Sequence, residues 1–433
     1  MNSCFQPDDN RLDISIFPTP IIAIIGLGYV GLPLAIEFGR KVPTIGFDTN
    51  TQRINELRER NDTTGEITSD EFSLSSFLSF TEQSEELSNA TVFIVAVPTP
   101  VDAFKRPDLG PLLLATRLIG SLLKKGDTVI FESTVYPGCT EDDCVPVLEK
   151  ESGLTYNTDF FCGYSPERIN PGDKTRRLPS IQKVTSGSSP SAARFVDQLY
   201  ASIITAGTFP VSSIRVAEAS KVLENAQRDV NISFMNEMAL LFDRLDLDTH
   251  EVLEAAATKW NFLPFRPGLV GGHCISVDPY YLLHKAESVG YLPQVLLSGR
   301  RINDQMGVFI ANKVIKLMIR KGHRIEGSRV LVLGVTYKEN CPDIRNSKVI
   351  DVIRELGEFG AAVDVWDPVV DPAVLLEKWR LIVTRPEGFY DAIVLTVSHD
   401  TFLDLSWLPH RHAQTVVYDV KGVLPRQIID ARL

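Results

Sequence analysis

The sequence predicts an α/β protein in which two open, doubly wound sheets are joined by a central segment of long helices. Three observations support this fold class. Short β-branched runs alternate with helix-forming stretches in the first two hundred residues and again in the last hundred, as in parallel sheets with crossover helices. Between them, residues 216–245 contain neither glycine nor proline, which is typical of one long helix. The length of 433 residues fits about three domains, which we expect at 1–215, 216–318 and 319–433.

The first expected strand, 21–25, leads directly into a glycine-rich turn. The order is strand, Gly26-x-Gly28-x-x-Gly31, then a helix-forming stretch, which is the context in which this motif binds a dinucleotide. The first glycine permits a tight turn, the second admits the pyrophosphate, and the third lets the helix pack on the strand. The next strand ends at Asp48, whose carboxylate can hold an adenosine ribose and would repel a 2′-phosphate. This arrangement predicts a Rossmann-like domain that binds NAD.

Polar residues follow the later strands of the same region. Two strands end in turns that carry Thr99 and Thr134, and Thr140 follows shortly after. Because ligands sit beyond the carboxyl ends of the strands in such a sheet, we expect these threonines near the nicotinamide; turn capping is the alternative role for each. A further strand-like run ends at Glu167 and Arg168, which either face the same cleft or form a surface ion pair.

The expected long helix carries Lys221, Asn225 and Arg228 at i, i+4 and i+7, so the three share one face. A lysine and an amide donor aimed at one point would stabilise an oxyanion. A solvated polar stripe is the alternative interpretation.

The stretch Gly271-Gly-His-Cys-Ile-Ser-Val-Asp278 places Cys274 in a glycine-framed loop with a carboxylate four residues later. The two glycines allow backbone to approach a ligand closely. A thiol near cations can ionise and attack an electrophilic carbon, so Cys274 is the candidate nucleophile. On local sequence alone, a cysteine is more often a small buried hydrophobe.

The last hundred residues repeat the alternation of strands and helices without a full dinucleotide fingerprint. The strand 329–333 ends at Gly334, and Lys338 and Arg345 follow it. Basic residues at this edge of an open sheet suit the phosphates of a mononucleotide.

Composition excludes several functions. The formal charge of −11 argues against non-specific binding to nucleic acid or to an acidic membrane. No apolar run is long enough to span a bilayer and the first twenty residues lack an apolar targeting core, so we expect a cytoplasmic protein. Six cysteines without a C-x-x-C pair and seven histidines without H-E-x-x-H predict neither a disulfide framework nor a metal site.

Taken together, the motifs resemble those of the UDP-glucose/GDP-mannose dehydrogenase family over nearly the whole chain. The resemblance rests on motifs that occur in the family's order, namely Gly26-x-Gly-x-x-Gly31, Pro98-Thr-Pro100, Glu132-Ser-Thr134, Ser165-Pro-Glu167, Lys221-x-x-x-Asn225 and Gly271-Gly-His-Cys274. Residues 165–174 and 259–268 look like the branch that oxidises UDP-N-acetylhexosamines. The resemblance implies two nucleotide-binding domains joined by a helical dimerisation domain, and hence a homodimer, in a pathway of polysaccharide biosynthesis such as capsule or O-antigen synthesis.

The resemblance also implies a four-electron oxidation of the sugar C6 alcohol to a carboxylate with two NAD⁺. Cys274 would capture the intermediate aldehyde as a thiohemiacetal, and the second oxidation would give a thioester for water to hydrolyse. Lys221 and Asn225 match the pair around the reacting oxygen, Glu167 matches the base for thioester hydrolysis, and Asp278 matches the carboxylate that orders water and lysine.

The motifs and the resemblance together define the expected site. The expected catalytic residues are Cys274, Lys221, Asn225, Glu167, Asp278 and Thr134. The expected contacts with NAD are Gly26, Gly28, Tyr29, Val30, Gly31, Asp48, Arg53, Pro98, Thr99, Thr134 and Thr140. The expected contacts with the UDP-N-acetylhexosamine are Arg168, Ile169, Lys221, Asn225, Arg228, Arg266, Gly271, Tyr337, Lys338 and Arg345.

Two departures bear on the sugar. Glucose-oxidising members carry a glutamate where this chain has Pro171 and a lysine where it has Val277, and both changes argue against glucose. UDP-N-acetylglucosamine is the leading substrate, with UDP-N-acetylgalactosamine beside it. The alternatives are oxidation of UDP-N-acetylmannosamine or UDP-glucose, and a non-catalytic protein that only binds a sugar nucleotide.

Overall fold

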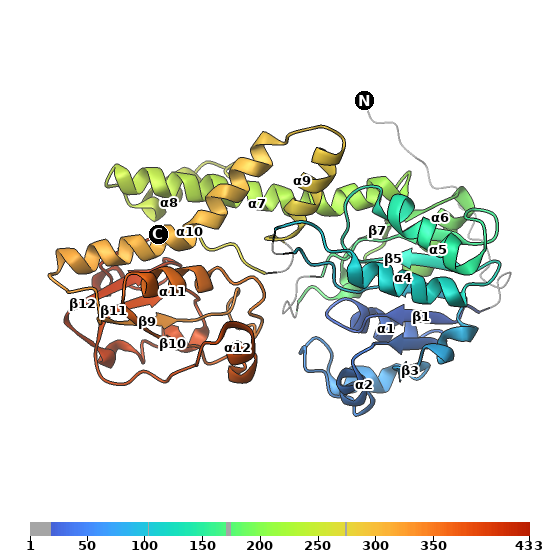
Figure 1. The fold of residues 1–433 in the computed structure, drawn as a ribbon, viewed down its shortest axis with the longest axis horizontal. Helices are drawn as coiled ribbons and strands as arrows, with labels where there is room; N and C mark the ends of the chain where they lie inside the picture. The colour runs from blue at the N-terminus through green and yellow to red at the C-terminus, as the bar shows by residue number, and fades with distance from the viewer. Residues whose placement is uncertain (1–18, 103, 170–174, 273–274) are drawn as a thin grey trace. The chain divides into compact units, whose positions relative to one another are not determined.

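The computed structural model describes residues 19–102, 104–169, 175–272 and 275–433 (Figure 1). The chain divides into two compact units, which are described separately. Unit 1 comprises residues up to 99, 109–133 and 138–218, and unit 2 comprises 100–108, 134–137 and 219–433.

Unit 1 is built on an eight-stranded sheet with the strand order β3-β2-β1-β4-β5-β6-β7-β8. The strands are β1 Ile22–Ile25, β2 Thr44–Phe47, β3 Leu78–Thr81, β4 Val92–Val95, β5 Thr128–Phe131, β6 Phe161–Tyr164, β7 Lys183–Gly187 and β8 Thr208–Pro210. Neighbouring strands are parallel except for β6 and β7, which are antiparallel. The central strands, such as β1 with the sequence IAII, are buried along their whole length, as expected where helices cover both faces of a parallel sheet.

Short helices connect these strands and bury their apolar faces against the sheet. They are α1 Gly31–Gly39, α2 Thr51–Arg58, α3 Ser69–Leu74, α4 Gly110–Leu122, α5 Val145–Ser152 and α6 Pro190–Ala201, with a π-helical turn at Thr140–Cys144 and 3₁₀ turns at Ser84–Asn89 and Leu178–Ser180. The core joins apolar residues of α1, α2 and α6 to β1 and β4. The strand order reverses on the two sides of β1 and β4, so the carboxyl ends of these two strands form the switch point where ligands bind in doubly wound sheets.

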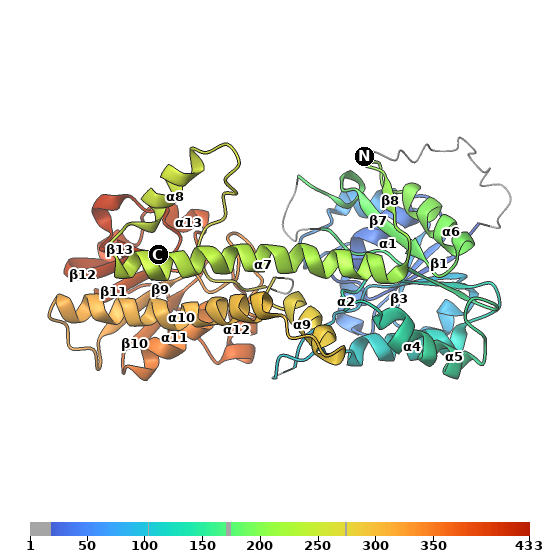
Figure 2. The same ribbon diagram turned by 90° about the horizontal axis from the view of Figure 1, so that it is seen from above.

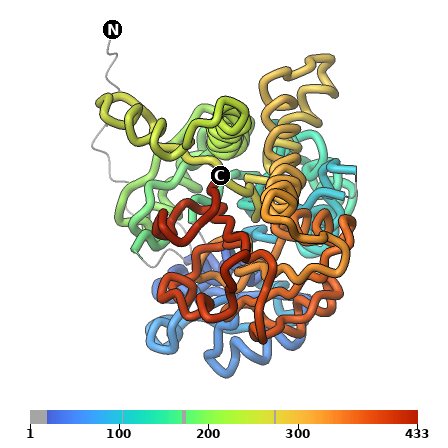
Figure 3. The backbone as a smooth tube through the Cα atoms, turned by 90° about the vertical axis from the view of Figure 1, so that its left-hand side faces the viewer, coloured from blue at the N-terminus to red at the C-terminus, as the bar shows by residue number. Residues whose placement is uncertain are grey.

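The long helix predicted for residues 216–245 is confirmed as α7, which spans Ile214–Arg244 and continues from unit 1 into unit 2. Unit 2 also contains α8 Thr249–Ala257, α9 Asp278–Ser288 and α10 Gln294–Arg320. Within unit 2, α7 and α10 run alongside each other (Figures 2 and 3). Arg300 of α10 donates to Asp229 of α7 at 2.6 Å, so this buried ion pair fixes the two helices against each other.

The C-terminal part of unit 2 is the second predicted α/β sheet. All neighbouring strands are parallel in the order β10-β9-β11-β12-β13. The strands are β9 Arg329–Leu333, β10 Ala362–Trp366, β11 Tyr390–Leu395, β12 Arg411–Asp419 and β13 Ala431–Arg432, and the helices are α11 Val349–Glu358, α12 Pro372–Trp379 and α13 Asp400–Leu403, with 3₁₀ turns at Leu408–His410 and Arg426–Ile428. Helix α10 packs on α11 and on the sheet, so the long-helix segment and this sheet share one core.

None of the helices in the described ranges is both long and apolar enough to cross a membrane.

Candidate active site

The glycine turn after β1 has the geometry that a dinucleotide requires. Gly26 has φ +92° and donates its N–H to Phe47 O at 2.8 Å. A Cβ on Gly31 would lie 1.8 Å from Gly26 O, whereas a Cβ on Gly28 would meet nothing within 4 Å. The backbone of the protein itself therefore demands Gly26 and Gly31. The space beside Gly28 stays open at the start of α1, where a pyrophosphate approaches in such folds.

Asp48 and Arg53 stabilise this turn by hydrogen bonds to the backbone of Leu27. Asp48 Oδ2 accepts the Leu27 N–H at 2.9 Å, and Oδ1 accepts the Asn50 N–H at 2.9 Å. The buried Arg53 donates through Nε to Leu27 O at 3.0 Å and also pairs with Asp62. Arg53 thus supports the turn, while Asp48 keeps lone pairs for a ribose. The residues present fit a dinucleotide.

The other expected cofactor residues lie in the segments that follow β1, β4 and β5. Val30 packs against the core of unit 1, Pro98 is exposed and Thr99 is buried after β4. Thr140 is buried at the start of the π-helical turn, where its N–H donates to Glu218 Oε1 at 2.9 Å. Thr134 is half-buried, follows Glu132 and Ser133 after the end of β5, and belongs to unit 2.

Glu218 is a site residue that sequence analysis missed. Its carboxylate also accepts the Gly138 N–H at 2.5 Å, so it caps the loop that leads to Thr140. Burial raises the pKa of Glu218 to about 7, although these hydrogen bonds act in the opposite direction. No pattern in the sequence marks it, because a glutamate in a helix-forming stretch ordinarily faces solvent.

The Ser-Pro-Glu motif follows β6 and directs Glu167 into a buried group of polar side chains. Glu167 is 6% exposed, and its Oε1 accepts the backbone N–H groups of Arg168 and Ile169. Its Oε2 lies 3.7 Å from the Lys183 ammonium. The Arg168 side chain reaches Gln182 O at 3.0 Å. Sequence analysis placed Glu167 and Arg168 at a strand end but gave no role to Lys183.

Unit 2 assembles three of the expected catalytic residues. Lys221 and Asn225 lie one turn apart on α7, and Asp278 begins α9. Asn225 Nδ2 donates to Asp278 Oδ2 at 2.5 Å. Burial raises the pKa of Asp278 to about 6, and the Lys221 ammonium and the Asn225 hydrogen bond oppose that rise. The buried carboxylate and ammonium and the half-buried amide therefore form one polar cluster, and the exposed Arg228 lies two turns along α7 from Lys221. Cys274 lies outside the described residues.

The glycines before Cys274 are required by a close contact with the segment after β9. A Cβ on Gly271 would lie 2.9 Å from Asn346 O, and one on Gly272, which has φ +86°, would lie 2.9 Å from the Tyr337 ring. Asn346 Nδ2 donates to Gly272 O at 3.0 Å. The expected substrate residues Gly271 and Tyr337 are thus brought together within unit 2.

A cavity opens beside this contact, at the carboxyl ends of β9, β11 and β12. Its lining residues are Leu269, Gly271, Thr336, Tyr337, Ser347, Lys348, Val349, Thr396, Val397 and Lys421. Lys348 and Lys421 were missed by sequence analysis. The rule that ligands sit beyond strand ends would have found Lys421, which follows β12 closely. Two expected residues make other contacts, because Arg345 pairs with Asp343 at 2.5 Å and Arg266 lies 3.1 Å from His250 Nδ1.

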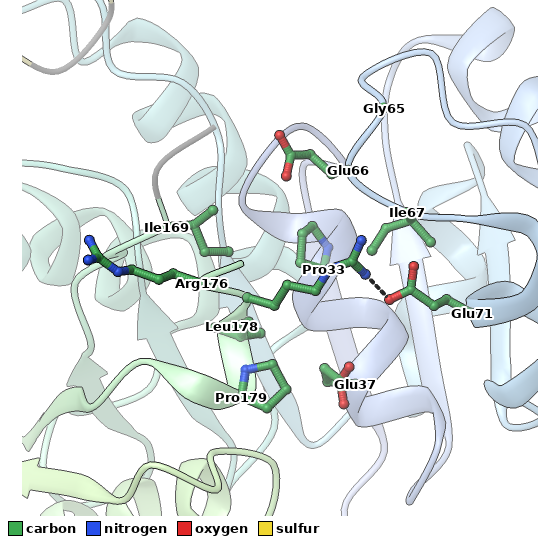
Figure 4. A pocket seen from close by; sticks show the side chains of 11 residues that line it. Pro33, Glu37, Gly65, Glu66, Ile67, Glu71, Ile169, Arg176, Leu178 and Pro179 are labelled. Carbon is green, nitrogen blue, oxygen red and sulfur yellow. Dashed lines mark hydrogen bonds and ion pairs between the residues drawn. The ribbon is translucent and has the colours of Figure 1, made fainter. Parts of the chain in front are cut away.

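A second pocket lies in unit 1 beside α1 (Figure 4). Arg177 forms an ion pair with Glu71 in its wall, which ties the chain after the Ser-Pro-Glu motif to α3. The lining residues are Pro33, Glu37, Gly65, Glu66, Ile67, Glu71, Ile169, Arg176, Arg177, Leu178 and Pro179.

Comparison with known proteins places this geometry in a family. Sequence models of the UDP-glucose/GDP-mannose dehydrogenase family match three segments, the NAD binding domain at 21–204, the central domain at 215–305 and the UDP binding domain at 331–426. The chain is 55% identical over 417 residues to the UDP-N-acetyl-D-glucosamine 6-dehydrogenase of Pseudomonas aeruginosa, covering 95% of this chain and 99% of that protein. It is 52% identical over 417 residues to the enzyme of the same name from Salmonella typhi, covering 95% and 98%. Among solved structures, the UDP-D-ManNAc dehydrogenase of Pyrococcus horikoshii aligns with a TM-score of 0.86 at 29% identity, covering 95% and 98%.

Proposed function

Because the chain belongs to the UDP-glucose/GDP-mannose dehydrogenase family, we propose that it oxidises the C6 hydroxyl of UDP-N-acetylglucosamine to the carboxylate with two NAD⁺. The identity to relatives named for UDP-N-acetylglucosamine, 55% and 52%, carries the choice of sugar. The relative from Pyrococcus horikoshii named for UDP-N-acetylmannosamine is 33% identical. The product is the UDP-N-acetylhexosaminuronic acid.

Bound NAD⁺ supplies the two-electron oxidation in each half of the reaction, and the glycine turn and Asp48 hold it. Lys221 and Asn225 stabilise the negative charge that develops on the C6 oxygen. Asp278 holds the Asn225 amide in place. The cavity with Lys348 and Lys421 at the strand ends of unit 2 suits the uridine diphosphate.

Cys274 explains why the oxidation can proceed past the aldehyde. Its sulfur bonds to the aldehyde carbon, and the oxygen takes up a proton to give a thiohemiacetal. Loss of a hydride from the carbon and of the proton from the hydroxyl, two electrons and two protons in all, then leaves a thioester on the protein. Glu167 takes a proton from water as the water oxygen bonds to the acyl carbon, and the C–S bond breaks to release the thiolate and the acid.

The same proposal includes three domains, a homodimer and a cytoplasmic location. The family matches support boundaries near 215 and 318. Exposed Leu223, Phe234 and Leu241 lie on one face of α7 by helical spacing, which supports a subunit interface on that helix. A monomer mass by light scattering at micromolar concentration would contradict the homodimer. The cytoplasm supplies both NAD⁺ and nucleotide sugars.

The first test is the NADH yield from excess NAD⁺ and limiting UDP-N-acetylglucosamine, with the product identified by mass. We expect two NADH per sugar and an acid. UDP-N-acetylgalactosamine, UDP-N-acetylmannosamine and UDP-glucose run in parallel. One NADH with an aldehyde product would contradict the role of Cys274. If only UDP-N-acetylmannosamine is oxidised, that sugar nucleotide is the substrate instead. If the protein binds NAD⁺ and the sugar nucleotides but forms no NADH, it is a binding protein without activity.

A further inference from the structure

The only antiparallel pairing among the described strands of unit 1 brings a lysine to the Ser-Pro-Glu motif. In the β6–β7 pair, Gly163 is opposite Gly187 and Tyr164 is opposite Ser186. Continued by three residues, this register places Lys183 opposite Glu167. A parallel β7 would have carried its first residue to the other edge of the sheet. The direction of β7 therefore decides which side chain stands behind Glu167.

Lys183 is held there by three oxygen atoms. It is 2% exposed, and its Nζ lies 2.6 Å from Glu132 Oε2, 3.1 Å from Pro166 O and 3.7 Å from Glu167 Oε2. A buried ammonium without partners is very costly, so the lysine, once buried, fixes the positions of all three. Two of the three belong to the motif that carries the proposed base.

Glu132 and Tyr200 hold the lysine in place. Glu132 is 1% exposed at the end of β5, and its Oε1 accepts the hydroxyl of Tyr200 from α6. The ammonium also lies 5.2 Å from the centre of the Tyr200 ring. The ionisable groups that meet at this point are thus Glu132, Lys183, Tyr200 and Glu167, contributed by β5, β7, α6 and the turn after β6.

The protonation of Glu132 adjusts the charge of this cluster. Burial raises the pKa of Glu132 to about 7, which Lys183 opposes and Glu167 reinforces. With Glu132 protonated, the cluster holds one ammonium and one carboxylate. With Glu132 ionised, two carboxylates share one ammonium.

We propose that Lys183 is a positioning residue that holds the Glu167 carboxylate oriented for hydrolysis of the thioester, with Glu132 and Tyr200 holding Lys183. This inference rests on the proposed function, in which Glu167 takes the proton of the attacking water. It assigns Lys183 to the hydrolytic step, because the contacts of its ammonium within unit 1 are with Glu132, with Tyr200 and with the motif that carries the proposed base.

The test separates oxidation from hydrolysis within one turnover. Lys183→Met removes the ammonium, and Glu132→Gln/Lys183→Met removes the paired carboxylate as well, so that no uncompensated charge stays buried. Lys183→Arg keeps a cation, and Tyr200→Phe is the matched control that removes only the hydroxyl donated to Glu132 and keeps the ring beside the ammonium. The burst of NADH, the mass of the acid-quenched protein and steady-state turnover are measured across pH with UDP-N-acetylglucosamine.

We expect both Met variants to keep a burst of two NADH per site, to accumulate the acyl-protein, and to lose about tenfold or more in steady-state turnover. Lys183→Arg should restore most of the turnover, and Tyr200→Phe should change it less than threefold.

Two outcomes overturn the inference. The first is a Met variant that gives the full burst of two NADH per site and also keeps steady-state turnover within twofold of the original protein. The other is failure of both Met variants to bind NAD⁺, which would assign Lys183 to folding. Glu167→Gln separates this inference from the function on which it rests. If that variant accumulates no acyl-protein, the proposed base is wrong; if it accumulates the acyl-protein and the Met variants do not, only the role of Lys183 fails.

Discussion

The two sheets begin with the same local structure and put it to different uses. In unit 1, Gly26 has φ +92° and an aspartate, Asp48, accepts the next N–H at 2.9 Å. In the C-terminal sheet, Gly334 also has φ +92°, and Asp367 accepts the N–H of Val335 at 2.7 Å. In both, the glycine follows the first strand of its sheet and the aspartate follows the second strand. The resemblance is therefore one of backbone construction.

The two aspartates differ in how many protein groups donate hydrogen bonds to their carboxylate oxygens. Asp48 Oδ1 accepts the Asn50 N–H and stays partly exposed. Asp367 is buried, its Oδ1 accepts two further backbone N–H groups, and its Oδ2 meets His399 Nε2 at 3.1 Å. The first aspartate can still receive a ribose, whereas the second is saturated by the protein. The same turn thus serves binding in one sheet and folding in the other.

The two sheets also differ in how soon a helix begins after the glycine turn. Helix α1 begins at Gly31, within the glycine motif, so its N-terminus faces the turn. Helix α11 begins only at Val349, and the intervening segment carries Tyr337 and Lys338. A long polar segment in place of a helix end fits a mononucleotide better than a dinucleotide.

The largest effect should separate two glycines of one motif. Gly31→Ala should cost about 3 kcal/mol or more of unfolding free energy, because its Cβ would overlap Gly26 O. Gly28→Ala should leave the unfolding free energy nearly unchanged and weaken NAD⁺ binding. Urea unfolding and calorimetric titration with NAD⁺ measure the two effects. Equal destabilisation by both changes would contradict the assignment of Gly28 to the ligand.

The next comparison is between Asp48 and Asp367, which occupy equivalent positions in the two sheets. Burial opposes ionisation of Asp367, but the hydrogen bonds from His399 and backbone N–H groups outweigh it and lower its pKa to about 2 from 3.8. This stabilisation is present above pH 3.8 and is lost as the pH falls towards 2, amounting to about 2 kcal/mol. Asp367→Asn should remove that part of the acid sensitivity, whereas Asp48→Asn should instead weaken NAD⁺ binding about tenfold. The unfolding free energy is measured between pH 5 and about 2. If Asp367→Asn loses stability with falling pH as steeply as the original protein does, Asp367 is not the source of this acid sensitivity.

The smallest expected effect concerns the cavity of the C-terminal sheet. Lys421→Met should weaken UDP binding about tenfold, or roughly 1.4 kcal/mol, because the cavity loses one of the two lysines that line it. The binding of NAD⁺ should not change. Lys378→Met, on an exposed face of α12, is the control. Equal UDP affinity in the two variants would remove Lys421 from the site.

Sequence alone determined the features that depend on local backbone geometry. The predicted fold class, NAD cofactor and dehydrogenase family are confirmed. They could be predicted because the glycine turn with Asp48 and the helical spacing of Lys221 and Asn225 each involve residues that are close together in the sequence. The division into three domains and the roles of the site residues stay predictions.

Tertiary structure decided which charges are buried and what meets them. Lys183 reaches Glu167 through the antiparallel register of β7, and Asp367 is saturated through His399 from a later strand end. Neither spacing nor composition reveals such pairs, since both depend on strand direction and on contacts between residues far apart in the chain. A buried charge survives only with a partner, and only packing determines which partner it has.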